Sequence, residues 1–377
     1  MRRLLTIGHS YVVAQNRRLA HEMAVAGRGH WQVAVAAPLR LRGDLRQIDL
    51  EPIENEACDL HPLPMRAGWS AHLRVYGTGL RGLLNDGWDV VHCWEEPYVA
   101  AAAQVARHIP ERARFVPATF QNIAKRYPPP VSWSEQHVLR RADGWIAFGH
   151  TVHDTQKDRP GYRSRPGRVI TPGVDVGVFR PDPDARQRVR QTLGWTAGEL
   201  VAGFSGRFVP EKGIATLLDA LRHSSVGWNL LFVGGGPMQA RIEQVRTQHP
   251  SRVRVVTDVP HDEVPAYLNA MDLLCAPSLD TSRWREQFGR MLIEAMACGV
   301  PVIGSRTGEI PYVVGDAGVL VTGSGADAWR EQIDRLAPDE GRRRDLAAAG
   351  LARTRSMFAW PAIARQHLAF FEELCGG

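Results

Sequence analysis

Two carboxylates, Glu286 and Glu294, lie eight positions apart in EQFGRMLIEAMACGVPVIGS (286–305), a segment that is otherwise mostly apolar. A carboxylate buried among such neighbours is costly unless it is paired or hydrogen-bonded. Within one helix, eight residues span about 12 Å, so the two groups could not bond each other. They could hold two ends of one ligand, with Glu286 on the loop before a helix and Glu294 within it. A salt bridge between Glu294 and Arg290, four residues earlier on the same face, is the alternative.

The start of this helix is a predicted phosphate site. Phe288, Gly289 and Arg290 come directly before the apolar run. A helix N-terminus offers free amides and a partial positive charge, both of which suit an anion. Glycine at position 289 would allow close approach of the ligand. The pattern therefore fits a ligand that extends from a sugar through a diphosphate to a ribose.

Two cations follow another predicted strand, in GFSGRFVPEKGIATLLDAL. Arg207 and Lys212 lie on a loop that leads into a helix predicted over 214–221. Converging at its N-terminus, they would neutralise a diphosphate and stabilise it as a leaving group. An exposed basic loop, with Glu211 pairing locally, is the alternative. The chain has only three lysines, so a lysine at 212 indicates a position that needs a compact charge.

The other glycines and histidines at strand ends are weaker indications of a ligand site. The run VGGGPMQAR (233–241) lacks the third glycine of the GxGxxG dinucleotide motif, which argues weakly against NAD. Close approach of a ligand and a plain strand-to-helix turn are both open explanations for its glycines. His9 and His92 also lie at strand ends, where a single histidine can be structural. His150 and His153 lack a third ligand, so we expect no metal site.

Composition sets the class of protein. The chain has 377 residues, 44% hydrophobic and 23% charged, as expected for two ordinary globular domains. It has no apolar run of 18 residues, so we expect no membrane-spanning helix. Its five cysteines show no CxxC spacing, and this cysteine usage favours a reducing cytoplasm. The formal net charge of +6 comes almost wholly from arginine. It is compatible with phosphorylated or other anionic partners, and we expect no nucleic acid.

Strand-like apolar runs alternate with helical periodicity throughout, which predicts parallel sheets covered on both faces. The Pro- and Gly-rich stretch 171–188 divides two such series. We therefore expect an α/β chain with two Rossmann-like, doubly wound domains, 1–172 and 173–355. A final helix, 356–377, would pack back onto the first. Because ligands bind beyond the carboxyl ends of parallel strands, the cleft between the domains is the predicted active site.

One segment suggests a surface role. In MRAGWSAHLRVYGTGLRGLL (65–84), apolar residues recur at helical spacing with arginines between them. The pattern predicts one helix with its apolar face on the sheet. A helix lying at a membrane surface is the alternative. The apolar positions are Trp69, Leu73, Tyr76, Leu80 and Leu83, and the arginines are Arg66, Arg74 and Arg81.

Taken together, these motifs resemble a known family. The segment EQFGRMLIEAMACGVPVIGSRTGEIPYVV is similar to the E-x7-E region of the retaining glycosyltransferases of family 4, which have the GT-B fold. The resemblance covers roughly residues 165–325, and the motifs VITPGVDVGVFRP, GRFVPEKG, LLFVGGGPM and VPHDEVPAYLNAMDLLCAPS occur in the family's order. In the first domain, NIAKRYPPP and VLRRADGWIAF are similar to family segments.

The resemblance implies an enzyme that moves a hexose-type sugar from a nucleoside-diphosphate sugar, UDP- or GDP-linked, without a metal. The anomeric configuration would be retained, and the departing diphosphate would take the acceptor's proton. Arg207 and Lys212 would bind the diphosphate, Glu286 the sugar and Glu294 the ribose hydroxyls. The other residues of the implied donor site are Phe288, Gly289, Arg290 and Met291, with phosphate held by the amides of the last three.

The first loop departs from the family pattern, because many relatives have two glycines where this chain has Gly8–His9–Ser10. His9 and Gln121 are the candidates for the acceptor or sugar side. The acceptor is expected to be a glycan, a lipid-linked molecule or a small molecule. The resemblance implies a cytoplasmic enzyme. A peripheral position at the inner face of the membrane is also compatible with it. A GT-B phosphorylase, a nucleotide-sugar epimerase and a non-catalytic nucleotide-sugar-binding protein are the alternatives.

Overall fold

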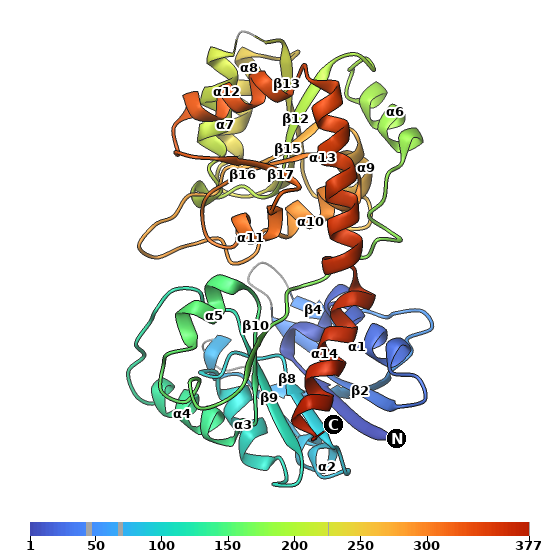
Figure 1. Ribbon diagram of the computed structural model, residues 1–377, viewed down its shortest axis with the longest axis vertical. Coiled ribbons are helices and arrows are strands. Elements are labelled where there is room, and N and C mark those ends of the chain that lie inside the picture. Colours follow the sequence, from blue (N-terminus) through green and yellow to red (C-terminus); the bar gives the residue numbers. More distant parts are fainter. Residues whose placement is uncertain (43–46, 67–70, 225, 377) are drawn as a thin grey trace. The chain divides into compact units, whose positions relative to one another are not determined.

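A computed structural model describes residues 1–42, 47–66, 71–224 and 226–376 (Figure 1). The chain divides into two compact units. The first unit holds Met1–Gly173 together with the C-terminal segment that begins at Trp360, and the second holds Val174–Ala359. The units thus divide after Gly173 and Ala359, where the sequence placed boundaries after residues 172 and 355.

The first unit is built on a seven-stranded sheet in which every neighbouring pair is parallel, in the order β11-β10-β9-β8-β1-β2-β5. Five of these strands match the apolar runs in the sequence, whereas β5 and β11 lack a comparable run. The strands are β1 (Arg2–Ile7), β2 (Trp31–Pro38), β5 (Asp59–Leu63), β8 (Val90–Cys93), β9 (Arg114–Thr119), β10 (Trp145–Ala147) and β11 (Gly167–Val169).

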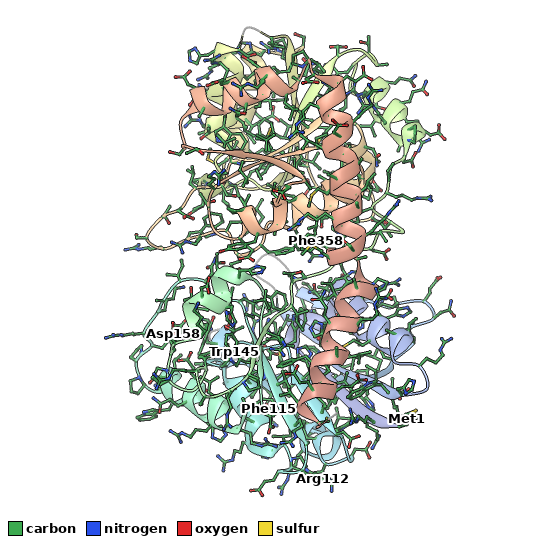
Figure 2. The ribbon with its side chains drawn as sticks, viewed as in Figure 1. Met1, Arg112, Phe115, Trp145, Asp158 and Phe358 are labelled. Carbon is green, nitrogen blue, oxygen red and sulfur yellow. The ribbon has the colours of Figure 1, made fainter. Side chains whose placement is uncertain are left out.

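Both faces of this sheet are buried, because successive side chains along a strand point to opposite faces. Leu4 and Leu5, neighbours on β1, belong to two different hydrophobic clusters. The cluster on one face is completed by α1 (Ala14–Ala26) and α14 (Trp360–Leu374), which pack side by side. Figure 2 shows the side chains of Phe115 and Trp145 within this unit.

Several short elements complete the first unit. The remaining helices and small antiparallel ladders are α2 (Leu80–Leu84), α3 (Ala100–His108), α4 (Val131–Arg141), α5 (His150–Gln156), the 3-10 turns η1 (His9–Val12) and η2 (Ala71–Leu73), and the ladders β3 (Arg40–Arg42) with β4 (Gln47–Asp49) and β6 (Met65–Arg66) with β7 (Val75–Tyr76).

The prediction of one helix over 65–84 was wrong. The described part of this segment consists of β6, η2, β7 and α2, and Trp69 lies outside the described residues. Gly77 and Gly79 interrupt the apolar periodicity, and Gly79 has a φ of +100° just before α2. Glycine is poor inside a helix and favours such a conformation, so the chain turns here.

The second unit contains a six-stranded parallel sheet in the order β14-β13-β12-β15-β16-β17. Its strands are β12 (Leu200–Arg207), β13 (Trp228–Gly235), β14 (Val253–Val256), β15 (Leu273–Ala276), β16 (Val302–Ser305) and β17 (Gly318–Val321). Its helices are α6 (Pro183–Thr192), α7 (Ile214–His223), α8 (Gln239–Gln248), α9 (Val264–Asn269), α10 (Arg290–Ala297), α11 (Ile310–Val314), α12 (Ala326–Leu336) and α13 (Glu340–Arg353), with η3 (Pro210–Lys212) and the π-turn η4 (Thr354–Phe358).

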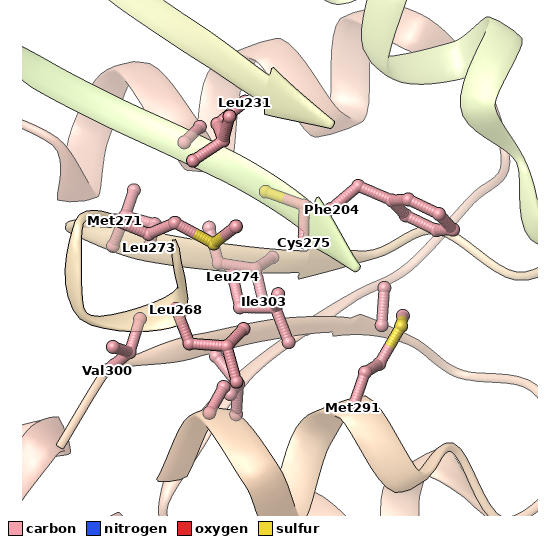
Figure 3. Packing of buried hydrophobic residues seen from close by; sticks show 14 of the residues in the cluster. Phe204, Leu231, Leu268, Met271, Leu273, Leu274, Cys275, Met291, Val300 and Ile303 are labelled. Atoms are coloured by element: carbon pink, nitrogen blue, oxygen red, sulfur yellow. The ribbon is translucent and has the colours of Figure 1, made fainter. Parts of the chain in front are cut away.

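One hydrophobic core holds the second unit together, and its centre lies around β12 and β15. Figure 3 shows Met291 reaching from α10 toward the strands, where Phe204 and Cys275 are packed. Met271 lies so close to β12 that a Cβ at Gly203 would be 2.1 Å from its sulfur. The apolar residues of α10 are therefore fixed by the sheet, and the helix start is fixed with them. No helix in the described parts of the chain is long and apolar enough to cross a membrane.

Each sheet has one point where the strand order reverses. In the first unit the reversal lies between β1 and β8, and in the second between β12 and β15. Loops leaving neighbouring strands diverge there, which leaves a crevice outside the carboxyl ends where ligands of open α/β sheets bind. His9 follows β1, and Arg207 ends β12. The fold thus brings predicted site residues to both reversal points.

A glycine fixes the loop that carries Lys212. Gly213 has a φ of +70°, and a Cβ at this position would lie 1.9 Å from the carbonyl oxygen of Pro277. We expect Gly213→Ala to destabilise the second unit by about 2 kcal/mol or more, because backbone strain and a steric clash add. Urea unfolding followed by circular dichroism measures this. Gly198→Ala is the control, because a Cβ there meets nothing within 4 Å. Equal stability of the two variants would contradict this account of the loop.

Candidate active site

Glu286 is a buried carboxylate just before α10, with its side chain 8% exposed. Its Oε2 accepts hydrogen bonds from Lys212 Nζ at 2.5 Å and from Ser278 Oγ at 2.9 Å. Such donors satisfy a charge that burial would otherwise penalise. Ser278 follows β15 and Lys212 follows β12, so both come from the reversal point of the second sheet.

Lys212 is nearly buried too, with 12% of its side chain exposed, and its ammonium lies 5.6 Å from the centroid of the Trp284 ring. An ammonium over an aromatic face gains a cation–π interaction. The alternative of an exposed loop with local pairing to Glu211 therefore does not describe Lys212, whose ion-pair partner is Glu286. The ammonium of Lys212 is therefore fixed between a carboxylate and an aromatic ring.

The backbone around Glu286 is held by a second close contact. The amide of Glu309 donates to the carbonyl oxygen of Glu286 at 3.1 Å. Gly308, with a φ of +50°, lies so near that a Cβ would be 2.1 Å from the same oxygen. Only glycine fits this approach without strain. The loop that carries Glu286 is therefore braced by the segment after β16.

The start of α10 has the features of an anion site. Gly289 caps the helix with a left-handed φ of +81° and provides no side-chain cap. Within the described chain, the amides of Arg290 and Met291 make no backbone hydrogen bond; the first donor is Leu292, which bonds back to Gly289. Open amides at a helix start bind anions. As predicted, Glu286 lies on the loop before the helix and Glu294 within it.

Glu294 is held only loosely. Its Oε1 lies 3.9 Å from Arg290 Nε and 3.9 Å from His261 Nε2, and 10% of its side chain is exposed. The ion pair with Arg290 that the sequence offered as the alternative is therefore present, but both separations exceed hydrogen-bond length. Burial raises the pKa of Glu294, and Arg290 lowers it. The charged form is therefore stabilised less than it would be in water.

Arg207 is exposed at the end of β12, and no ion pair involving it occurs in the described part of the chain. The glycines of β13 lie next to this strand end. A Cβ at Gly234 would be 2.0 Å from the carbonyl oxygen of Gly206, and one at Gly236 would be 2.7 Å from that of Phe208. Packing of backbone against backbone thus requires two of the three glycines. Gly235 meets no atom within 4 Å and is the one open to a ligand.

His9 lies at the reversal point of the first sheet, bound to a buried carboxylate. The His9 amide donates to Glu95 Oε1 at 2.7 Å, and its Nδ1 contacts Glu95 Oε2. The hydroxyl of Tyr76 also donates to Oε1, at 2.9 Å. The charge of Glu95 raises the pKa of His9, while burial and Arg74 act in the opposite direction. The His9 side chain is 43% exposed and that of Glu95 only 1%.

Gln121 and His92 have structural contacts instead. Gln121 follows β9 and is 8% exposed, and its amide donates to the carbonyl oxygen of Ile123 at 2.8 Å. His92 is fully buried within β8, with Nδ1 3.0 Å from Thr6 Oγ1. The assignment of Gln121 to the sugar or acceptor side stays a prediction.

Sequence reasoning did not identify four residues that complete these sites: Ser278, Trp284, His261 and Glu95. The clearest signal for one of them is the double carboxylate Glu95–Glu96, which comes directly after a predicted strand. Acidic residues at the carboxyl end of a buried parallel strand lie where ligands bind. Ser278, Trp284 and His261 are recognised only by contacts that form in the folded chain, and no local sequence pattern indicates such contacts. Across the described residues, no group of three or more metal-ligating side chains is arranged to hold an ion.

The pair between Lys212 and Glu286 can be tested by its coupling. Removing one partner leaves the other charge buried, and this typically costs about 3–5 kcal/mol. We therefore expect Lys212→Met and Glu286→Gln each to destabilise the protein, and the double variant to lose less than the sum of the two. Equilibrium unfolding of all four proteins gives the coupling energy. Strict additivity would mean that the two charges do not depend on each other.

Glu294 should make stability fall as pH rises. Its folded-state pKa is raised by burial, so the folded protein binds more protons than the unfolded chain between the unfolded pKa and the higher folded one. Above that window the ionised group opposes folding. We expect Glu294→Gln to raise the melting temperature at neutral pH and to have little effect below the window. Thermal unfolding across pH measures it, with the exposed Glu331→Gln as control. A lower melting temperature at neutral pH would contradict the assignment.

Comparison with known proteins covers the part of the chain that contains these residues. The family model "Glycosyl transferases group 1" matches residues 185–353, which include Arg207, Lys212, Glu286 and Glu294. A D-inositol 3-phosphate glycosyltransferase of Corynebacterium jeikeium is 29% identical over 306 residues, covering 76% of this chain and 69% of the relative. Its counterpart from Xylanimonas cellulosilytica is 30% identical over 286 residues, covering 73% and 66%. That of Salinispora tropica is 32% identical over 263 residues, covering 63% and 52%.

Solved structures share the fold. A sucrose-phosphate synthase from Thermosynechococcus elongatus aligns with a TM-score of 0.72 and 23% identity, covering 99% of both chains. HepE from Anabaena, in complex with UDP, has a TM-score of 0.74 and 19% identity, covering 99% of this chain and 100% of the other. A glycosyltransferase from Rickettsia africae has a TM-score of 0.76 and 15% identity, covering 100% and 99%. These structures and the two parallel sheets show the GT-B fold. The family match and the curated relatives identify the chain as a glycosyltransferase of family 4.

Proposed function

We propose that this glycosyltransferase moves a hexose-type sugar from a nucleoside-diphosphate sugar to its acceptor without a metal and with retention at the anomeric carbon. The observation that supports it most strongly is the buried Glu286 carboxylate, held by Lys212 and Ser278 beside the open amides of α10. In this proposal one wall of the second unit binds the whole donor. Glu286 contacts the sugar, the α10 amides and the two cations bind the diphosphate, and Glu294 accepts from the ribose.

The chemistry of the leaving group follows from charge. When the bond from the anomeric carbon to the diphosphate oxygen breaks, its electron pair stays on that oxygen. Arg207 has no competing ion pair among the described residues, and the ammonium of Lys212 is already fixed by Glu286 and Trp284. Positioned cations stabilise such a developing charge without having to reorganise. They supply the role that a bound metal has in other transferases.

Retention follows if the acceptor attacks on the face from which the diphosphate leaves. The departing oxygen then takes the acceptor's proton as the new carbon–oxygen bond forms, so no separate base is needed in the second unit. Glu286 fits a different task. Its carboxylate is already engaged by two donors, so we propose that it orients hydroxyl groups of the sugar rather than attacking carbon.

Glu294 suits the ribose because a carboxylate can accept hydrogen bonds from two hydroxyl groups. Its nearest cations, Arg290 and His261, lie at 3.9 Å, and neither bond is short. Ribose hydroxyls would supply the missing hydrogen bonds to a buried charge. The pyrimidine nucleotide UDP is the first nucleotide to test for binding, since HepE, a solved structure of the same fold, was crystallised with UDP and with UDP-glucose. Glu294→Gln should abolish the stabilisation by that nucleotide.

Arg207 and Lys212, which we call the donor cradle, are expected to affect the rate of transfer. Arg207→Ala and Lys212→Ala should each slow sugar transfer at least about tenfold, since each removes charge stabilisation worth over a kcal/mol in the transition state. The rate is measured by release of nucleoside diphosphate from UDP-, GDP-, ADP- and dTDP-sugars. Arg188→Ala, an exposed arginine on α6, is the matched control.

Circular dichroism gives the folded fraction of each variant, so that the transfer rates are compared per folded molecule. Wild-type rates in both cradle variants would refute the donor cradle. NMR of the first-formed product gives the anomeric configuration, and an inverted product would overturn the retaining mechanism while leaving donor binding untouched.

A further inference from the structure

Trp284 is a half-buried residue on the loop between β15 and α10, the loop that also carries Ser278 and Glu286. The Lys212 ammonium lies over its ring, 5.6 Å from the ring centroid. An ammonium this close to an indole face is attracted by the electrons of the ring. In the proposed function the charge of Lys212 acts on the diphosphate, and no step is assigned to the ring.

The backbone of this loop places the ring over the lysine. The amide of Trp284 donates to Thr281 Oγ1 at 2.9 Å, and the carbonyl oxygen of Trp284 accepts from the amide of Thr281 at 2.9 Å. These two bonds close a turn around Trp284. A third bond, from the Leu279 amide to the carbonyl oxygen of Glu211 at 2.8 Å, ties the loop to η3, which carries Lys212. The ring and the ammonium are therefore brought together by backbone contacts as well as by their own attraction.

A carboxylate and a ring hold an ammonium in different ways. A lysine ammonium has three N–H donors. Within the described chain, Nζ of Lys212 donates one hydrogen bond, to Glu286 Oε2. The ring attracts the positive charge without accepting a conventional hydrogen bond. It therefore holds the cation and leaves the other donors for an anion, whereas a second carboxylate in its place would take a donor and cancel the charge.

The ring also limits the movement and the hydration of the lysine. A lysine side chain is flexible and its ammonium is strongly hydrated, but the side chain of Lys212 is only 12% exposed. Where water is excluded, a charge acts more strongly on a neighbouring anion. A cation that is already confined needs little reorganisation when negative charge develops on a leaving group. The aromatic contact thus prepares Lys212 for the bond-breaking step.

We propose that Trp284 is a positioning residue for sugar transfer, whose ring confines the Lys212 ammonium and keeps its remaining donors open to the donor diphosphate. The inference rests on the proposed function for the identity of this anion. Because the ring acts through Lys212, it affects the step in which charge develops on the departing oxygen more than it affects donor binding. The position requires an aromatic side chain, and another apolar side chain does not replace it.

Transfer kinetics of a graded set of variants provides the test, with whichever of the four nucleotide sugars is turned over. Trp284→Leu keeps an apolar cover on the lysine but has no aromatic face, and Trp284→Phe keeps a weaker one. We expect Trp284→Leu to lower kcat about tenfold with a much smaller change in KM, and Trp284→Phe to recover most of the loss. Trp133→Leu, at a tryptophan that is 64% exposed on α4, should leave both constants unchanged.

A double-mutant cycle shows whether the ring acts through the lysine. With Lys212→Met already in place, Trp284→Leu should lower kcat by no more than about twofold further. The same large loss in both backgrounds would overturn the proposal, because the ring would then act on another group. Equal rates of Trp284→Leu and Trp284→Phe would also overturn it, since an apolar cover would then be enough. Circular dichroism gives the folded fraction by which each rate is corrected.

Fluorine NMR of the full chain labelled with 5-fluorotryptophan detects the contact without turnover. The Trp284 resonance is assigned by its absence in Trp284→Phe. Inorganic pyrophosphate, the probe, should shift this resonance in the wild-type chain and in Lys125→Met, at an exposed lysine. It should not shift the resonance in Lys212→Met. A Trp284 resonance that does not respond to pyrophosphate in the wild-type chain would overturn the proposal.

The role of Trp284 and the proposed function can fail separately. If Arg207→Ala and Lys212→Ala slow transfer while Trp284→Leu has the wild-type kcat, the donor cradle stands and the role of Trp284 fails. If no nucleotide sugar is turned over but pyrophosphate shifts the Trp284 resonance through Lys212, the proposed function fails. The ring then remains a positioning residue for a lysine that binds an anion.

Discussion

The buried carboxylate of Glu286 is the constraint on which the second unit's site depends. A charge at 8% exposure requires partners, and it finds them in Lys212 after β12 and Ser278 after β15. These two strands are adjacent in the sheet but far apart in sequence. Satisfying one carboxylate thus ties together two loops that would otherwise be independent. It also fixes the ammonium of Lys212, which the proposed function assigns to the diphosphate.

The same physical arrangement occurs in the first unit. Glu95 is still more buried, and it holds His9 after the neighbouring strand, with Tyr76 as a further donor. In both units a carboxylate at the reversal point of a parallel sheet fixes a cation. The difference lies in the cation. Histidine has an ordinary pKa near physiological pH, and the charge of Glu95 raises the pKa of His9.

Glycines make these close arrangements possible. Gly213 approaches the Pro277 carbonyl and Gly308 approaches the Glu286 carbonyl, each with a positive φ. The glycines at 234 and 236 have the same role for β12, since their missing side chains leave room for the neighbouring backbone. Sequence alone could not separate a ligand-binding glycine from a packing glycine, because both explanations need the same absent Cβ.

The sequence predicted the alternation of strands and helices and the two doubly wound halves, and it singled out the residues that we propose for the donor site. It did so because buried parallel strands are continuous apolar runs and because charged residues within such runs stand out. It failed over 65–84, where apolar residues at helical spacing belong to a short ladder, a turn and a separate helix. The spacing of apolar residues does not show that Gly77 and Gly79 turn the chain within this segment.

The amino-acid sequence by itself therefore determined the class of fold, the family and which residues could carry charge to a ligand, since these follow from residue type and local spacing. Tertiary structure alone decided which charges meet. The partnership of Lys212 with Glu286, the contact of His261 with Glu294 and the anchoring of His9 on Glu95 all join segments that are distant in the chain. Such contacts depend on strand order, and strand order is a property of the folded sheet that no local pattern encodes.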